Sequence, residues 1–156
     1  MTASTPPAQA GIAIRLRHEF MAPREKVFRA WTDPEILKRW WCPVGFAIES
    51  SEIDLRAGGR YKFGMRKIAG GPVVYVLGSF LEVTAPEHLV YTWSWENAFS
   101  GMPPTRVQVR FLEKGAGTEV ILIHENFPEA IVCLAHRAGW LAVWDRIAAA
   151  AQDLTK

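Results

Sequence analysis

Five turn signals divide residues 46–126 into six short, mostly apolar runs, and one long helical pattern follows them. The signals occupy residues 57–59, 69–72, 85–87, 97–104 and 114–117, and all of them contain glycine or proline, which favour turns over regular strands. Connections this short leave no room for crossover helices, so neighbouring runs are expected to pair as antiparallel strands. A curved antiparallel sheet closed by one long helix often encloses a cavity. The order of elements therefore predicts a fold that encloses a cavity, but it indicates no particular reaction.

The remaining elements follow from periodicity and capping residues. Residues 12–20 alternate between apolar and polar side chains, which is typical of a strand with one solvated face. Two short helices are predicted over 24–31 and 34–40, with Asp33 as the N-cap of the second and Pro34 in its first turn. Six strands are predicted over 46–55, 60–68, 73–84, 88–96, 105–113 and 118–126, and a helical region over 128–154. The fold class is therefore α+β, with a curved antiparallel sheet of about seven strands wrapped around a long C-terminal helix.

The side chains that face the core follow from the period of each element. Alternation places large apolar residues on one face of three strands, namely Tyr61, Phe63 and Met65, then Leu89, Tyr91, Trp93 and Trp95, then Val107, Val109 and Phe111. In the last helix, the predicted apolar stripe consists of Ile131, Leu134, Leu141, Trp144, Ile147, Ala148 and Ala151. Gly139 predicts a weak point in this helix, where it kinks or breaks. Arg146 is expected on its solvent face.

Composition excludes several classes of function. The net charge of +2 comes with no basic run, which argues against a nucleic-acid-binding protein. No apolar run is long enough to predict a membrane span, and the N-terminus lacks the pattern of a signal peptide. Cys42 and Cys133 lack metal-binding or redox spacing and are expected to be reduced thiols, which favours a cytoplasmic location. Residues 1–11 are interpreted as a disordered leader, and residues 12–156 as one domain, either a monomer or a homodimer.

Three local signatures carry a resemblance to a known family. They are the stretch 30–43, which contains Trp40 and Trp41, the turn 54–61, and the combination of residues 117–124 with residues 136–140. With the element order, they make the chain similar to the activator of heat-shock-protein-90 ATPase homologue family, within the START-like (SRPBCC, helix-grip) superfamily. Cys42 stands where relatives usually carry glycine. The resemblance implies a sheet wrapped around the last helix with an apolar cavity between them. It also implies a chaperone as partner, although relatives that stimulate the chaperone carry an additional N-terminal domain.

His124 is the candidate catalytic residue, because it ends a strand on the same parity as Val120 and Leu122. An inward imidazole near a cavity mouth can act as an acid or a base near neutral pH. The alternative is a core histidine whose hydrogen bonds are satisfied by the backbone. Trp41 has two interpretations as well, as part of a pocket gate or as a hydrophobic plug. No histidine or cysteine spacing predicts a metal site, and no motif predicts a cofactor.

Three functions remain open at this stage. The preferred hypothesis is a non-enzymatic domain that binds a small lipophilic or aromatic molecule in an apolar cavity between the sheet and the C-terminal helix. The second is a stress-response protein whose partner is a chaperone. The third is an enzyme of the cyclase, dehydratase or hydrolase kind found elsewhere in the superfamily, using a pocket His or Tyr. The candidate pocket residues are Trp41, Phe46, Tyr61, Phe63, Met65, Tyr75, Tyr91, Trp93, Val109, His124, Trp140 and Trp144.

Overall fold

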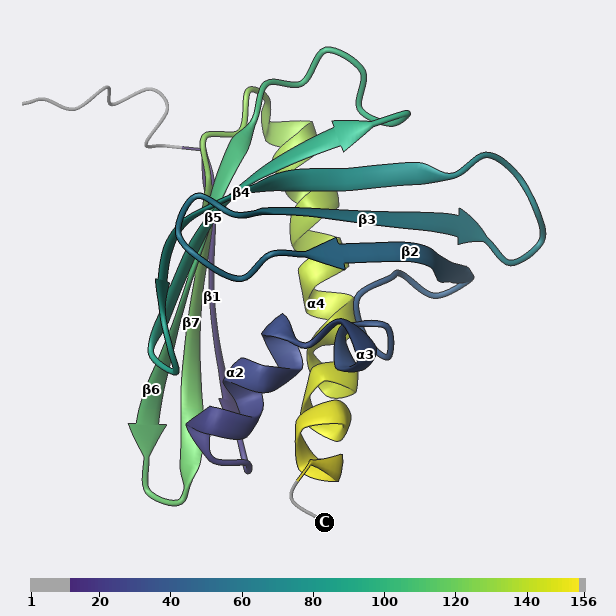
Figure 1. Ribbon diagram of the computed structural model, residues 1–156. Helices are drawn as coiled ribbons and strands as arrows, with labels where there is room; N and C mark the ends of the chain where they lie inside the picture. Colours follow the sequence, from purple (N-terminus) through teal and green to yellow (C-terminus); the bar gives the residue numbers. More distant parts are fainter. Residues whose placement is uncertain (1–11, 155–156) are drawn as a thin grey trace, which may run out of the picture.

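A seven-stranded antiparallel sheet curves around one long helix in the computed structural model, which describes residues 12–154 (Figure 1). The elements are β1 (Ala13–Phe20), α2 (Arg24–Thr32), α3 (Pro34–Leu37), β2 (Phe46–Ile53), β3 (Arg60–Lys67), β4 (Val74–Thr84), β5 (His88–Glu96), β6 (Thr105–Lys114), β7 (Gly117–Glu125) and α4 (Ala130–Asp153). The predicted fold class and element order are confirmed. The predicted leader lies outside the described residues.

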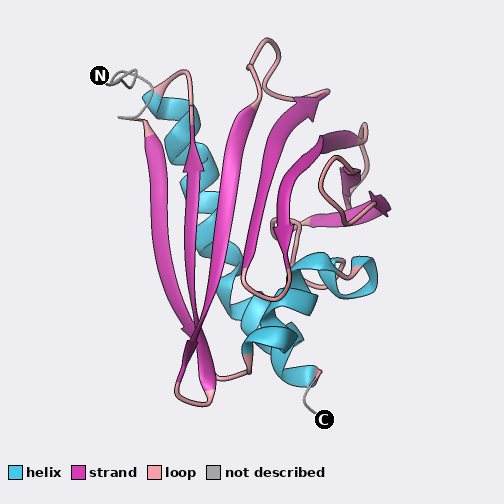
Figure 2. Cartoon of the chain, turned by 60° about the vertical axis from the view of Figure 1, so that its left-hand side comes forward, coloured by secondary structure: helices cyan, strands magenta, loops and turns pink. Residues whose placement is uncertain are grey.

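The strand order is β1-β7-β6-β5-β4-β3-β2, so β1 and β2 form the two edges. Strands β1, β7 and β6 run side by side at one end of the sheet (Figure 2). The sheet then curves so that β2 and β3 lie across α4 (Figure 1). From β2 to β7, each strand pairs with the next one along the chain, because the connections between consecutive strands are short. The concave face of the sheet is therefore covered by α4.

The core lies between the concave face and the helices. Antiparallel register places Val109 opposite Leu122 and Phe111 opposite Val120, and all four side chains are fully buried. Residues directly opposite each other share a face of the sheet, so this register collects the apolar positions of both strands on the concave side. Helix α2 packs against α4 and against β6 and β7, and so closes one end of the core.

Helix α4 is continuous from Ala130 to Asp153, without the break that was predicted at Gly139. Its buried side chains are His136, Trp140, Val143, Trp144, Ile147, Ala150 and Ala151. The predicted stripe is therefore wrong in its first half, because Ile131, Leu134 and Leu141 are 73%, 62% and 46% exposed. The helix is apolar on most of its circumference, so periodicity does not select one face. In the structure, the face that carries the indoles of Trp140 and Trp144 is buried. Within residues 12–154, no helix combines the length and the apolarity that a membrane span needs.

Arg146 also departs from its expected position on the solvent face. Its side chain is only partly exposed, and its Nη2 atom is buried without a hydrogen-bond partner in the described part of the chain. The rotation of α4 that buries the indoles brings this arginine toward Cys42, whose thiol is buried. Burial raises the pKa of Cys42 to about 11, and the charge of Arg146 opposes this effect.

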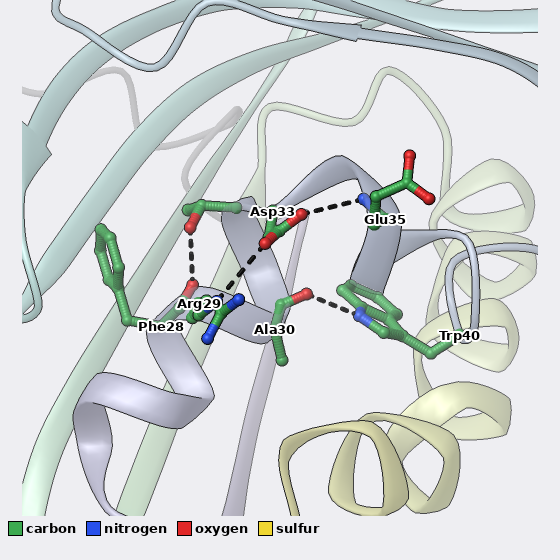
Figure 3. A network of polar contacts seen from close by, with 7 residues as sticks. Phe28, Arg29, Ala30, Asp33, Glu35 and Trp40 are labelled. Atoms are coloured by element: carbon green, nitrogen blue, oxygen red, sulfur yellow. Dashed lines mark hydrogen bonds and ion pairs between the residues drawn. The ribbon is translucent and has the colours of Figure 1, made fainter. Parts of the chain in front are cut away.

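The junction between α2 and α3 is built from polar contacts, shown in Figure 3. The Asp33 carboxylate accepts a hydrogen bond from the Glu35 backbone N–H at 3.0 Å and pairs with Arg29 at 3.4 Å, which confirms the predicted N-cap. The Trp40 indole N–H donates to the Ala30 carbonyl oxygen at 2.8 Å. Helix α3 ends at Leu37, earlier than predicted, and this hydrogen bond fixes the turn that follows it. The junction thus holds one tryptophan firmly beneath the sheet.

Candidate functional site

A cleft of about 530 Å³ lies between α4 and the half of the sheet that contains β3, β4 and β5. Its lining comes from four strands (β2, β3, β4 and β5), three loops and helix α4, which are far apart in the sequence. The lining residues are Trp40, Trp41, Pro43, Phe46, Met65, Lys67, Gly70, Gly71, Pro72, Val74, Trp93, Trp95, Ala98, Phe99, Ala135, His136, Gly139, Trp140 and Val143. Gly70, Gly71 and Phe99 are exposed, so the cleft reaches the surface at the loops that follow β3 and β5.

Indole rings in mutual contact form much of the cleft wall. The ring of Trp93 lies at the centre, with centroid distances of 6.1 Å to Trp41, 5.9 Å to Trp95 and 5.8 Å to Trp140. Tilted and edge-to-face arrangements at such distances are favourable aromatic contacts. Because each ring restrains its neighbours, the wall is formed by the folded protein itself and does not depend on a bound molecule.

Small residues of α4 leave room on the helix side of the cleft. Ala135, Gly139 and Val143 are spaced four residues apart, so they lie on one face of the helix. A Cβ atom added at Gly139 would meet no heavy atom within 4 Å. The glycine therefore borders open space, and a larger side chain at this position would project into that space.

His136 lies on the cleft wall with both ring nitrogens engaged. Its Nδ1 is 2.8 Å from the Val132 carbonyl oxygen and must carry the proton, because a carbonyl oxygen only accepts. Its Nε2 accepts the indole N–H of Trp95 at 2.9 Å. The imidazole is therefore neutral, and burial lowers its pKa, although the backbone contact to Val132 works in the opposite direction. In this state His136 orients Trp95 and has no free nitrogen for acid–base chemistry.

His124 points into the protein as predicted and is fully buried, but it does not line the cleft. The indole N–H of Trp140 donates to its Nδ1 at 3.1 Å, so the proton resides on Nε2. That nitrogen donates to the Thr105 hydroxyl at 2.8 Å, and the hydroxyl donates to the Trp93 carbonyl oxygen at 3.2 Å. Burial, and secondarily the neighbouring His136, lower its pKa well below the ordinary value. His124 is therefore a residue of the core, as the alternative expected, but its hydrogen-bond partners are side chains and not the backbone.

Two polar groups of the cleft wall have no partner. The indole Nε1 of Trp93 is buried and forms no hydrogen bond within residues 12–154. The side chain of Lys67 is exposed and forms no ion pair with any residue in the same range. Among the described residues, no group of three or more His, Cys, Asp or Glu side chains is placed to hold a metal ion. The unpaired groups of the site are thus hydrogen-bond donors.

A second cavity, much smaller, lies next to the cleft and contains the predicted tyrosines. It measures about 20 Å³, roughly the room of one water molecule, and Tyr61, Phe63 and Tyr91 contribute to its lining. The Tyr61 hydroxyl donates to the Thr92 carbonyl oxygen at 2.5 Å, and the Tyr91 hydroxyl accepts the indole N–H of Trp31 at 3.4 Å. Burial raises the pKa of both phenols. These hydroxyls are structural groups of the interior.

The structure brings together five of the twelve predicted pocket residues in the cleft: Trp41, Phe46, Met65, Trp93 and Trp140. Tyr75, Val109, Trp144 and His124 line neither cavity. Tyr75 is paired with Gly64 on the outer face of the sheet, where the ammonium of Lys62 lies 4.4 Å from its ring centroid. Val109 is fully buried in the core, and Trp144 packs against His18 of β1 at the far end of the helix.

Sequence reasoning missed several lining residues, of which His136, Trp95 and Gly139 matter most for the geometry. Trp95 has the same parity as Trp93, so the strand pattern contained a signal for it. His136 and Gly139 depend on the rotation of α4, and no signal in an almost uniformly apolar helix specifies that rotation. The exposed loops that contribute Gly70 and Phe99 have no periodicity from which to place them.

Comparison with known proteins gives one matching family. The sequence profile described as "Activator of Hsp90 ATPase homolog 1-like protein" matches residues 21–152. A search of curated proteins gave no match.

Solved structures share the fold along most of the chain. Protein CV1439 from Chromobacterium violaceum is 31% identical, with a TM-score of 0.81 over 89% of this chain and 96% of that protein. Protein NE0264 from Nitrosomonas europaea is 25% identical, with a TM-score of 0.78 over 92% and 96% of the two chains. The AHSA1 protein from Silicibacter pomeroyi is 26% identical, with a TM-score of 0.75 over 88% and 95%.

Proposed function

The chain belongs to the Activator of Hsp90 ATPase homolog 1-like family, and from that premise and the geometry of the cleft we propose that it binds a small hydrophobic molecule. The bound molecule would lie between α4 and β3, β4 and β5, against the indoles of Trp41, Trp93 and Trp140. The fold is consistent with a ligand-binding domain.

The observation that carries the proposal is the combination of volume and lining. Pockets that hold small molecules typically measure about 300–1,000 Å³ and combine apolar walls with a few polar groups. The cleft measures about 530 Å³, and its walls are aromatic and aliphatic apart from His136, Lys67 and the indole N–H groups.

Binding is favoured over catalysis by the state of the two histidines beside the cleft. An acid–base catalyst needs a nitrogen within reach of the substrate and a pKa near the working pH. His124 and His136 each have both nitrogens engaged inside the protein, and burial lowers the pKa of both. Their arrangement instead fixes the orientation of Trp140 and Trp95, the rings that a ligand would contact.

The proposal is tested by titrating the protein with the neutral probe N-phenyl-1-naphthylamine, following probe emission and quenching of tryptophan. Saturable binding is expected, because tryptophans line the cleft. Gly139→Phe should weaken this binding at least tenfold, since its ring would occupy the open space beside Gly139. The matched control is Ala138→Phe, which adds the same ring at an exposed neighbour outside the cleft lining.

Equal binding by both variants would place the probe elsewhere on the protein and contradict the proposed site. Absence of saturable binding across a panel of apolar compounds would reject a small-molecule function. The chaperone partner that the family description names would then become the leading hypothesis. The exposed side chains of Ile131, Leu134 and Leu141 on the outer side of α4 would be the first surface to test for it.

A further inference from the structure

One charged residue lies in the otherwise apolar lining of the cleft. Within the described chain, Lys67 is the lining residue that carries a full charge. It follows Met65 by two residues on β3 and is paired in register with Phe46 of β2. Alternate residues of a strand and directly paired residues both share a face of the sheet. Lys67 therefore continues the apolar row of Tyr61, Phe63 and Met65, and ends it with an ammonium group.

Two of the other three basic residues of β3 have acidic partners. Arg66 pairs with Glu49 at 2.8 Å, and Lys62 pairs with Glu96 at 3.4 Å, both from the opposite parity of the strand. Lys67 forms no such pair with any residue in 12–154, and the cleft lining described above contains no aspartate or glutamate. A positive charge thus stands at the edge of an aromatic cleft without a counter-charge.

We propose that the ligand of this cleft is a lipophilic monoanion, with its apolar body between the indoles and its anionic group paired with Lys67. This inference rests on the proposed binding function and specifies the chemical class of the ligand. An anion supplies the counter-charge that the lining lacks, and an ion pair beside apolar walls is stronger than one in bulk water. A cationic ligand would be repelled by the same group.

A flat aromatic acid and a fatty acid both present this chemistry. The cleft walls favour the aromatic acid, because Trp41, Trp93, Trp95 and Trp140 offer ring surfaces on which a flat ligand gains stacking energy beyond simple burial. The two kinds of ligand are distinguished by measuring how well 2-naphthoate, an aromatic acid, and dodecanoate, a fatty acid, displace a bound probe. More effective displacement by 2-naphthoate is expected, and preference for dodecanoate would assign the site to acyl chains and overturn the aromatic assignment.

The anionic preference is tested with two probes that share an aromatic body. 1-Anilinonaphthalene-8-sulfonate is N-phenyl-1-naphthylamine with an added sulfonate, so comparing them isolates the charge. Lys67→Met should weaken binding of the sulfonate probe about two- to fivefold, the range expected for a partly exposed ion pair. Binding of the neutral probe should remain unchanged. The control is Lys62→Met, which removes a lysine from the outer face of the same strand and should affect neither probe.

The outcomes separate this inference from the proposed function. If Lys67→Met binds the sulfonate probe as tightly as the unmodified protein does, the anionic preference is wrong, while neutral-probe binding still supports the cleft. If neither probe binds the unmodified protein, the binding function itself fails. If circular dichroism shows that Lys67→Met does not fold, the anionic preference is tested instead by measuring how salt changes probe binding to the unmodified protein. Added salt should weaken binding of the sulfonate probe and leave binding of the neutral probe unchanged. An equal effect of salt on the binding of both probes would overturn the proposal.

Discussion

Both ring nitrogens of His124 and of His136 are used by other groups of the protein, so protonating either ring removes an acceptor from an indole N–H. Burial lowers the pKa of each imidazole below its ordinary value. The unfolded chain therefore binds more protons than the folded protein once the pH falls below the unfolded pKa. The stability that the neutral rings contribute is present above that pKa and is lost as the pH falls toward the lower folded pKa.

We expect the free energy of unfolding to decrease on acidification from about pH 7 to about pH 5, with a slope of up to ~1.4 kcal/mol per pH unit for each histidine. Urea denaturation followed by circular dichroism measures this slope. His136→Gln should reduce this slope, because it removes one of the two buried rings. A pH-independent free energy of unfolding over this range would show that the two rings are not held neutral.

At the level of single elements, the strands were predictable and the rotation of α4 was not. Turn residues and alternation defined β5 to the residue and the other strands to within two residues at either end. Alternation is informative where one face is polar, as in β3. It fails in β4, where Val74, Tyr75 and Val76 are all apolar, and the face of Tyr75 follows only from its register with Gly64. The buried face of α4 could not be predicted for the same reason, since the helix is apolar on most of its circumference.

Gly139 provides a test of the open space beside α4. Gly139→Ala should raise the free energy of unfolding by about 0.5–1 kcal/mol, because glycine is less favourable than alanine in a helix interior. The new methyl group would meet no heavy atom within 4 Å. The contrasting variant is Gly78→Ala, whose Cβ would lie 2.1 Å from the Thr92 carbonyl oxygen and should destabilise the protein. Thermal and urea unfolding measure both. A destabilised Gly139→Ala would mean that this face of α4 is closed by packing.

For the molecule as a whole, α4 serves two separate regions along its length. Its first half lines the cleft through His136, Gly139 and Trp140, and its second half joins the core through Trp144 and Ile147. The element order predicted a cavity between the sheet and the helix, because one long helix must cover a curved sheet. The position of the cleft could not be predicted in the same way, since it depends on which indoles fill the interior and which remain at the edge of it.

Trp144 tests whether these two regions are independent. Its ring is stacked on His18 with centroids 5.1 Å apart and lies 6.1 Å from Phe20 and 6.1 Å from Trp31, so it joins α4 to β1 and α2. Trp144→Ala should cost about 3–5 kcal/mol through lost burial and the cavity left behind. A domain has only about 5–15 kcal/mol of stability in total. A sharply lowered urea midpoint is therefore expected.

The control for this variant is Leu141→Ala, since Leu141 is 46% exposed on the same helix. It should change the free energy of unfolding much less than Trp144→Ala does. The molecules of Trp144→Ala that remain folded should still bind N-phenyl-1-naphthylamine with unchanged affinity, because Trp144 does not line the cleft. Gly139→Phe should show the reverse pattern, with binding lost and stability kept. If Trp144→Ala weakened binding as much as stability, the cleft and the core would form one cooperative unit.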